Sequence, residues 1–215
     1  MFVVEGSAAA EQAIGDAVLV TRRVAEKITT LETPPDVMAI FPLLEPPPLV
    51  SLVSPHLLAV YADRIADPGN LGTLVRAAAA FGASALVTSP GCVDLHAPKV
   101  VRATMGAVFS LPLYADHLLK QVLRDLGAPR AYGLAAHGGE DLRAARLERP
   151  AVLVVGAERT GLSPDVEGVV SDRLTIPLAA EAGGAVESLN AGIAGAIALY
   201  EFARRAGALS HTQET

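Results

Sequence analysis

The feature that most constrains the fold is a series of short apolar segments that alternate with segments of helical pattern. The apolar segments cover residues 57–61, 85–88, 131–135, 151–155 and 174–176, and the helical patterns cover 70–81, 98–108, 116–126 and 187–205. Strands that are apolar along their whole length are typical of a parallel sheet buried on both faces. We therefore predict an α/β fold with a mostly parallel sheet and helices on both of its faces.

Single residues set the expected limits of these helices. Gly82 can adopt the left-handed conformation that ends helix 70–81, and Pro112 interrupts the pattern after 98–108. Asp116 is expected to cap helix 116–126.

A run of prolines divides the chain. Pro46, Pro47 and Pro48 are followed by Pro55, and because proline resists helix formation and lacks an amide donor, residues 43–55 are predicted to form a linker. Residues 1–42 are expected to form a short α/β unit, with strands at 2–5 and 37–41 and a helix at 8–14 capped by Ser7. Such a unit buries little core by itself, so we expect it to lean on the main domain or on a partner. The main domain is expected at 56–206, followed by a flexible tail at 207–215.

Composition allows a sizeable core. Hydrophobic residues make up 51% of the chain and charged residues 19%, which excludes global disorder. No apolar run reaches the roughly 18 uncharged residues of a membrane span, and residues 1–6 lack the basic start of a secretory signal. The single cysteine, Cys92, fits a reducing cytoplasm. His96 follows Cys92 by four residues, but no second pair of ligands completes a metal site, so we expect no metal and no membrane association.

The net charge of −6 argues mildly against a nucleic-acid partner, because phosphate contacts require lysine and arginine. An acidic enzyme can still carry a basic cleft, since the local field decides binding. Composition alone favours a small-molecule enzyme, and the motifs point elsewhere.

The first motif is Asn-x-Gly-x-x-x-Arg at 70–76, at the predicted junction between a strand and a helix. Asn70 is expected near the helix start, beside amides that lack helical partners. Arg76 follows less than two turns later, where its guanidinium can bind a phosphate or polarise a hydroxyl. A plainer interpretation makes Asn70 a cap and Arg76 the ion-pair partner of a nearby acid.

The second motif, Gly-x-Glu-x-x-Gly at 156–161, directly follows an apolar strand. Gly156 and Gly161 allow a sharp turn and a close approach to a ligand. Glu158 is expected at the C-terminal edge of the sheet, where α/β proteins bind ligands. The motif is not the dinucleotide fingerprint, because no Gly-x-Gly-x-x-Gly follows a first strand.

The third motif is Ile-Pro at 176–177, then a loop, then Glu-Ser-Leu-Asn at 187–190 opening the last helix. Ser188 and Asn190 can present polar groups beside free amides, or can act simply as caps. Small residues follow, including Gly192 and Gly195, each of which costs roughly 1 kcal/mol relative to alanine in a helix. Close packing, against the sheet or against a second copy of the chain, is expected to offset that cost.

In order and spacing, the three motifs resemble the signature motifs of the SpoU (TrmH) family of RNA ribose 2′-O-methyltransferases, in the SPOUT superfamily of knotted methyltransferases. The resemblance covers about residues 56–206. Residues 2–6 and 35–41 also resemble remnants of the small N-terminal substrate-binding domain of such enzymes, here much shortened.

The resemblance implies a deep trefoil knot, built from the second and third motifs, that binds S-adenosylmethionine in a bent form. It also implies a homodimer with the final helix and the first motif near the interface, which would account for Gly192 and Gly195. The residues that match the cofactor site are Leu134, Ala135, Ala136, Gly156, Glu158, Gly161, Ile176, Pro177, Ser188 and Leu189.

In the implied reaction, a ribose 2′-hydroxyl of tRNA or rRNA attacks the sulfonium methyl in line. Arg76 matches the family's proposed catalytic arginine. A free arginine is a poor base, so its role depends on a substrate phosphate or is to stabilise the developing alkoxide. We expect Arg76 and the ribose to be positioned by Asn70, Glu158, Ser188 and Asn190, although Glu158 could instead brace the knot loops.

RNA contacts are expected from basic side chains of the main domain, because the N-terminal unit is acidic, with seven acidic and three basic residues up to residue 50. The candidates are Arg64, Arg76, Lys99, Arg102 and Arg159. The loop 178–187 is longer than the family pattern and carries Glu181 and Glu187 where RNA would pass.

Three alternatives stay open. The chain could bind RNA or a protein as a family member without turnover, or methylate a base as a relative in the wider knotted superfamily. A nucleotide-dependent oxidoreductase fits the composition but lacks the fingerprint. The sequence identifies neither the RNA nor the nucleotide.

Overall fold

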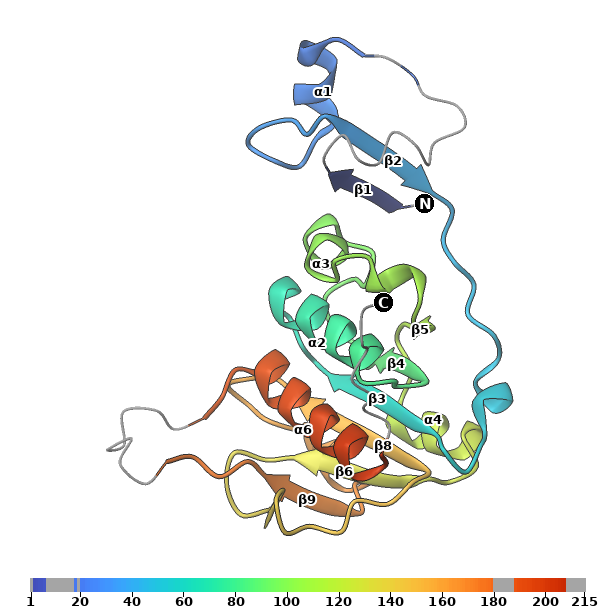
Figure 1. Cartoon of the computed structure of the whole chain (residues 1–215), viewed down its shortest axis with the longest axis vertical. Helices are drawn as coiled ribbons and strands as arrows, with labels where there is room; N and C mark the ends of the chain where they lie inside the picture. The colour runs from blue at the N-terminus through green and yellow to red at the C-terminus, as the bar shows by residue number, and fades with distance from the viewer. Residues whose placement is uncertain (1, 7–17, 19, 180–187, 208–215) are drawn as a thin grey trace, which may run out of the picture.

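The computed structural model describes residues 2–6, 18, 20–179 and 188–207. Seven strands form one sheet in the order β5-β4-β3-β8-β6-β9-β7, and every neighbouring pair is parallel (Figure 1). The strands are β3 (Leu58–Asp63), β4 (Ala85–Thr88), β5 (Leu113–Tyr114), β6 (Arg130–Leu134), β7 (Glu140–Asp141), β8 (Ala151–Gly156) and β9 (Asp172–Thr175). The predicted parallel sheet is confirmed. Its edge strands β5 and β7 were not predicted, because two residues are too short to show a pattern.

Helices cover both faces of the sheet. Because successive residues of a strand point to opposite sides, neighbouring residues of one strand pack against different helices. Val60 of β3 belongs to a buried cluster with residues of α2 (Pro68–Ala80) and α6 (Ala191–Arg205). Its neighbour Tyr61 belongs to a second cluster with residues of α4 (Leu119–Asp125) and α5 (Pro164–Glu167). The two-sided core predicted from the continuous apolar strands is therefore present.

Helix α2 begins earlier than predicted. Asp67 is its N-cap and accepts a hydrogen bond from the amide of Asn70 at 2.8 Å, while Pro68 opens the first turn. Asn70 therefore lies in the first turn, near the helix start as expected, and the plainer interpretation that makes it the cap of α2 is wrong. Gly82, with φ of 70°, follows the helix in the left-handed conformation that was predicted.

The helix predicted at 98–108 is interrupted. Helix α3 (Pro98–Ala103) ends early because Met105 and Gly106 adopt positive φ values of 51° and 90°. A 3₁₀ turn, η3 (Ala107–Phe109), follows. A residue with positive φ cannot continue an α-helix, so the apolar spacing alone misled the prediction.

Two other predicted helix starts are also wrong. Asp116 does not cap α4, because it has a φ of 60° and the helix begins at Leu119. Helix α6 begins at Ala191 rather than near Glu187, and Asn190 is its cap. Ser188 lies in the chain before that cap. The four-residue helix α5 was not predicted.

The N-terminal unit contains an antiparallel pair, β1 (Phe2–Gly6) and β2 (Val37–Phe41), and helix α1 (Arg22–Ile28), which was not predicted. The helix predicted at 8–14 lies outside the described residues. The ring of Phe41 meets that of Phe109 at 5.0 Å between centroids, and Arg102 donates a hydrogen bond to Thr30 at 2.9 Å. The N-terminal unit therefore packs on α3 and η3 of the main domain, which is one of the two contacts expected, the other being with a partner.

The proline-rich segment is extended but includes a helical turn, contrary to prediction. The hydroxyl of Tyr114 donates a hydrogen bond to the carbonyl of Pro47 at 2.5 Å. The 3₁₀ turn η2 (Leu49–Leu52) follows the three prolines and buries Leu49 against the second cluster. Within the part of the chain that the structure describes, no helix is long and apolar enough to cross a membrane.

Candidate functional site

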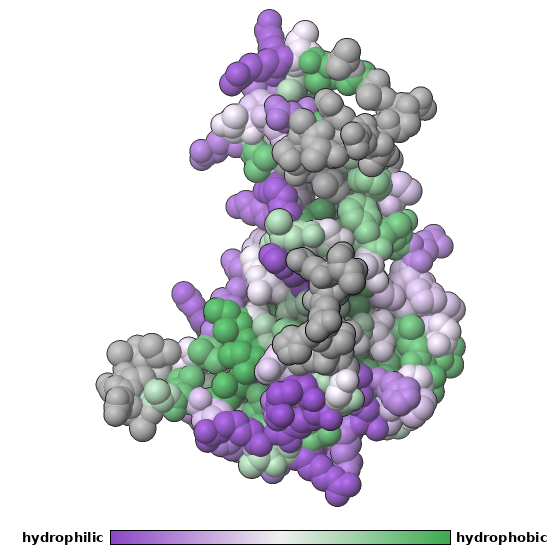
Figure 2. Space-filling model, viewed as in Figure 1, coloured by the Kyte–Doolittle hydropathy of each residue, from purple (hydrophilic) through white to green (hydrophobic). Residues whose placement is uncertain are grey.

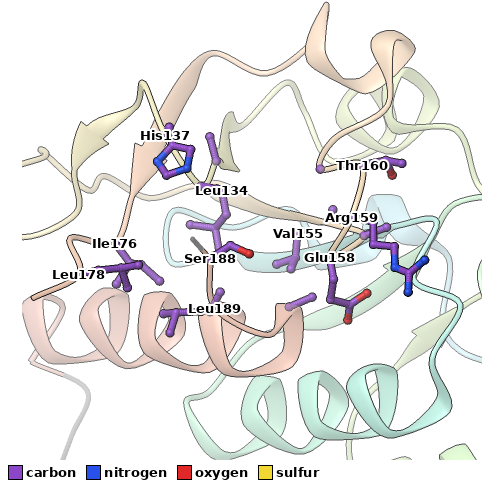
Figure 3. A pocket seen from close by; sticks show the side chains of 17 residues that line it. Leu134, His137, Val155, Glu158, Arg159, Thr160, Ile176, Leu178, Ser188 and Leu189 are labelled. Carbon is purple, nitrogen blue, oxygen red and sulfur yellow. The ribbon is translucent and has the colours of Figure 1, made fainter. Parts of the chain in front are cut away.

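A cavity of about 530 Å³ opens where the chain segments after β6, β8 and β9 meet the start of α6 (Figure 3). This is the C-terminal edge of the parallel strands, where α/β proteins bind ligands. Ile176 and Leu178 lie at one end of the cavity, and Glu158 lies at the other. The lining residues are Leu134, Ala135, Ala136, His137, Val155, Gly156, Ala157, Glu158, Arg159, Thr160, Gly161, Ile176, Leu178, Ser188, Leu189, Ala191 and Ala194.

The cavity brings together every residue predicted for the cofactor except Pro177, which is not among its lining residues. The sequence prediction missed His137, Val155, Ala157, Thr160, Leu178, Ala191 and Ala194. Most of these adjoin a predicted residue along the chain. His137, for example, directly follows Ala136 beyond the end of β6, so the position after a predicted strand was the available signal.

The second motif forms a tight turn whose shape requires glycine. The amide of Gly161 donates a hydrogen bond to the carbonyl of Ala157 at 2.8 Å. A Cβ on Gly156 would lie 2.4 Å from the carbonyl carbon of Gly161, a separation that real side chains do not tolerate. Gly161 itself has a φ of 66°. Both glycines are therefore needed for the turn that forms one wall of the cavity.

A chain of side-chain hydrogen bonds joins the three motifs. Asn70 donates from Nδ2 to Glu158, and Asn190 donates from Nδ2 to Oδ1 of Asn70 at 2.6 Å. Oδ1 of Asn190 accepts from the amide of Ile193 at 3.2 Å, which caps α6. The carboxylate thus orients the amide of Asn70, and that amide in turn fixes Asn190. Residues more than a hundred positions apart act as one unit here.

The small-residue face of α6 packs within the same chain. A Cβ on Gly192 would lie 3.0 Å from the carbonyl oxygen of Asn70, and one on Gly195 would lie 2.4 Å from Leu74 of α2. Gly195 also faces Val155 of β8, where a Cβ would lie 3.4 Å from Cγ2. The glycines therefore allow α6 to approach α2 and the sheet. The interpretation that they serve a contact with a second copy is corrected.

Arg76 lies on an exposed part of α2 and outside the set of described residues that line the cavity. Among the described residues Arg76 forms no ion pair, so the plainer interpretation of an acid-paired arginine has no support. The structure places Arg76 on the same helix as Asn70, between one and two turns away.

The other predicted RNA contacts occupy different elements. Arg159 lines the cavity, and Arg64 is exposed just after β3. Lys99 and Arg102 lie on α3, and the guanidinium of Arg102 is engaged with Thr30 of the N-terminal unit. Across the described residues, no group of three or more His, Cys, Asp or Glu side chains is arranged to hold a metal ion.

Comparison with known proteins places these features in a family. The model of the SpoU rRNA Methylase family matches residues 57–200. The 23S rRNA (uridine(2479)-2′-O)-methyltransferase of Streptomyces viridochromogenes is 32% identical over 185 residues, covering 81% of this chain and 62% of that relative. The 23S rRNA (guanosine-2′-O-)-methyltransferase RlmB of Nitrosomonas europaea is 32% identical over 169 residues, covering 78% of this chain and 61% of that relative. The chain thus spans about three fifths of the length of these two relatives.

Among solved structures, the SpoU methyltransferase AviRb from Streptomyces viridochromogenes in complex with the cofactor AdoMet matches with a TM-score of 0.80. The match has 27% sequence identity and covers 94% of this chain and 78% of that one. The family model spans β3 through most of α6, including every strand and helix that borders the cavity. Since the family model covers well over half of the chain, this protein belongs to the SpoU rRNA methylase family.

Proposed function

We propose that the chain is an S-adenosylmethionine-dependent RNA methyltransferase that modifies a ribose 2′-hydroxyl of tRNA or rRNA. The observation that carries the proposal is the hydrogen-bond chain from Glu158 through Asn70 to Asn190, beside a cavity at the C-terminal edge of the sheet. The named relatives, which are 2′-O-methyltransferases of rRNA, support it.

The cavity fits the cofactor in size and chemistry. Its volume of about 530 Å³ lies in the range of small-molecule sites, roughly 300–1,000 Å³. Leu134, Ile176 and Leu189 offer apolar walls suited to a purine ring, and Gly156 leaves the backbone accessible. When bound, S-adenosylmethionine supplies an electrophilic methyl group on a positively charged sulfur.

The protein's own residues would orient the attacking hydroxyl and stabilise the charge that develops on it. Arg76 is suited to this because a guanidinium keeps its positive charge and offers several donors. Its exposure on α2 leaves it accessible to RNA. The hydrogen bonds of Asn70 with Glu158 and Asn190 hold the start of α2 in place, which limits the positions Arg76 can reach.

The homodimer is proposed to form through the outer face of α6. Ile193, Ile197 and Tyr200 are 50%, 38% and 46% exposed, and their spacing places them on one side of the helix. Figure 2 shows hydrophobic surface gathered over this region of α6. An apolar stripe on a helix whose other face is already packed on α2 and β8 is the kind of surface that a second copy would cover.

The deep trefoil knot is proposed on the path of the C-terminal segments. Strand β9 lies between β6 and β7, whereas α6, which comes later in the sequence, packs on α2 and β8 (Figure 1). Family membership supports the proposal. A crystal structure with a continuous chain trace from 130 to 206 tests the proposal, and an unknotted chain path would contradict it.

Residues 1–42 are proposed as a shortened substrate-binding unit, 43–55 as the linker and 56–206 as the methyltransferase domain. The contact of the N-terminal unit with α3 supports a fixed placement relative to the main domain. RNA would contact Arg159 at the cavity and Arg76 on the exposed part of α2. A cytoplasmic location stays a prediction.

The test combines binding and product analysis. Purified protein is titrated with S-adenosylmethionine by calorimetry, then incubated with methyl-labelled cofactor and either tRNA or ribosomal RNA. Nucleoside mass spectrometry distinguishes a ribose-methylated product from a base-methylated one. We expect cofactor binding and a 2′-O-methylnucleoside. Base methylation would favour a relative in the wider superfamily, and binding without transfer would favour the member without turnover.

A further inference from the structure

Asp63 is a fully buried acid with an incomplete set of hydrogen bonds. It is the last residue of β3 and pairs in register with Gly156, the last residue of β8. Its Oδ2 accepts a hydrogen bond from the amide of Ser163 at 2.6 Å. Its Oδ1 is buried and has no hydrogen-bond partner among the described residues. A carboxylate is a costly group to bury, so its presence needs a reason beyond filling space.

The neighbouring polar groups do not account for Asp63. Tyr61 lies two residues earlier, on the same side of β3, but its hydroxyl donates to the carbonyl of His117 at 2.9 Å. The pKa of Tyr61 is raised to about 12, first by burial and then by the negative charge of Asp63. The amide of Ser163 is therefore the one hydrogen-bond donor that the described structure assigns to this carboxylate.

The hydrogen bond from Ser163 closes the far end of the second-motif turn. The turn leaves β8 at Gly156, folds back on itself through the Gly161–Ala157 hydrogen bond and returns to Ser163 before α5. Residues 156–161 line the cavity, and Glu158 at the tip reaches Asn70. The start of the turn is set by β8, so the anchor at Ser163 decides where its tip lies.

Asp63 is also connected to the first motif. The chain runs directly from Asp63 through a four-residue connection to α2, which carries Asn70. One side chain therefore links the end of β3, from which the first motif starts, to the end of the second-motif turn. Movement of either segment would alter the geometry between Glu158 and Asn70.

We propose that Asp63 is a positioning residue, whose carboxylate holds Ser163 and so sets the 156–161 turn in the shape that binds the cofactor. Asp63 does not line the cavity and acts through the turn. The inference rests on the proposed function, because it concerns the same cavity.

Substitutions at Asp63 and Ser163 distinguish the effect of losing the hydrogen bond from the effect of losing side-chain packing. Asp63→Ala removes the acceptor, whereas Asp63→Asn keeps an oxygen that can accept from the Ser163 amide. Ser163→Pro removes the donor and leaves Asp63 in place, and the φ of −69° at Ser163 suits proline. Val101→Ala is the control for general loss of stability, since Val101 packs with Val108 in a separate small cluster.

The measurements are calorimetric titration with S-adenosylmethionine, thermal unfolding, and hydrogen exchange of amides 157–163 in the free protein. We expect Asp63→Ala and Ser163→Pro to weaken cofactor binding at least ~10-fold and to speed exchange in the turn. Asp63→Asn is expected to stay within about 3-fold of the wild type. Val101→Ala is expected to lower the melting temperature without changing affinity.

The outcomes distinguish this inference from the proposed function. Unchanged cofactor affinity and unchanged exchange in folded Asp63→Ala, with only a lower melting temperature, would overturn the positioning role. If Asp63→Ala does not fold, Ser163→Pro gives the same comparison. If the wild type does not bind S-adenosylmethionine, the proposed function fails, and the exchange rates still decide whether Asp63 holds the turn.

Discussion

Glu201 and Arg205 face each other one turn apart on α6, with Nε of Arg205 2.6 Å from Oε1 of Glu201. The same guanidinium donates to the backbone carbonyls of Leu142 and Arg143 at 2.9 and 2.8 Å. The carboxylate therefore holds Arg205 in the orientation that ties the last turn of α6 to the segment after β7.

Acid should weaken the fold through Glu201. Hydrogen bonds from Arg204 first, and from Arg205 after it, lower the pKa of Glu201 to about 2 from its ordinary value of 4.5. Because the folded pKa is the lower one, the stabilisation is complete above about pH 4.5 and is lost as the pH falls towards 2. We predict that Glu201→Gln unfolds at lower denaturant concentration than the wild type at neutral pH and that the two curves converge near pH 2. Exposed Glu140→Gln is the control, and a constant gap between wild type and Glu201→Gln across this range would contradict the prediction.

Gly156→Ala should weaken binding of the cofactor in the cavity. The added Cβ would clash with the backbone of Gly161, so the turn has to open. We expect cofactor affinity to fall more than ~10-fold, equivalent to about 1.4 kcal/mol, in calorimetric titration. Gly168→Ala is the matched control, since its Cβ would meet Pro164 at an ordinary 3.6 Å with φ of −71°. Equal affinities for the two variants would show that the turn does not form the binding wall.

Arg76→Ala should separate binding from chemistry. Arg76 lies outside the cavity lining, so affinity for S-adenosylmethionine should not change. Methyl transfer to a confirmed RNA substrate should fall by about 100-fold or more, as for loss of a group that stabilises developing charge. Arg76→Lys should recover little activity, because lysine lacks the planar fork. Arg124→Ala on α4 is the control, and turnover by Arg76→Ala at the wild-type rate would remove this residue from the mechanism.

Ile197→Glu should disrupt the proposed dimer. The substitution places a charge in the centre of the exposed apolar stripe on α6 while leaving the face that packs on α2 unchanged. Light scattering after size exclusion should give a dimer for the wild type and a monomer for the variant. Leu118→Glu, at an exposed apolar position before α4, serves as control and should remain dimeric. A monomeric wild type would refute the assembly.

The sequence determined the elements whose character is set locally. The five apolar segments became β3, β4, β6, β8 and β9, because a strand buried on both faces must be apolar along its length. Gly82 ended α2 as predicted, because its conformation depends on a few neighbouring residues. Where local geometry competed with apolar spacing, as at Met105 and Gly106, the spacing alone gave the wrong helix length.

The motifs also allowed most of the cavity lining to be predicted, because each lies directly after a strand or before a helix at the C-terminal edge of the sheet. Tertiary structure alone decided which distant groups meet. The small residues of α6 were evident in the sequence, but only the fold shows that Gly195 leaves room for the side chain of Leu74 of α2. Nothing in the spacing indicates that Asp63 accepts from Ser163, or that Asn190 donates to Asn70, because such pairs form only when the parallel strands and the returning α6 bring their ends together.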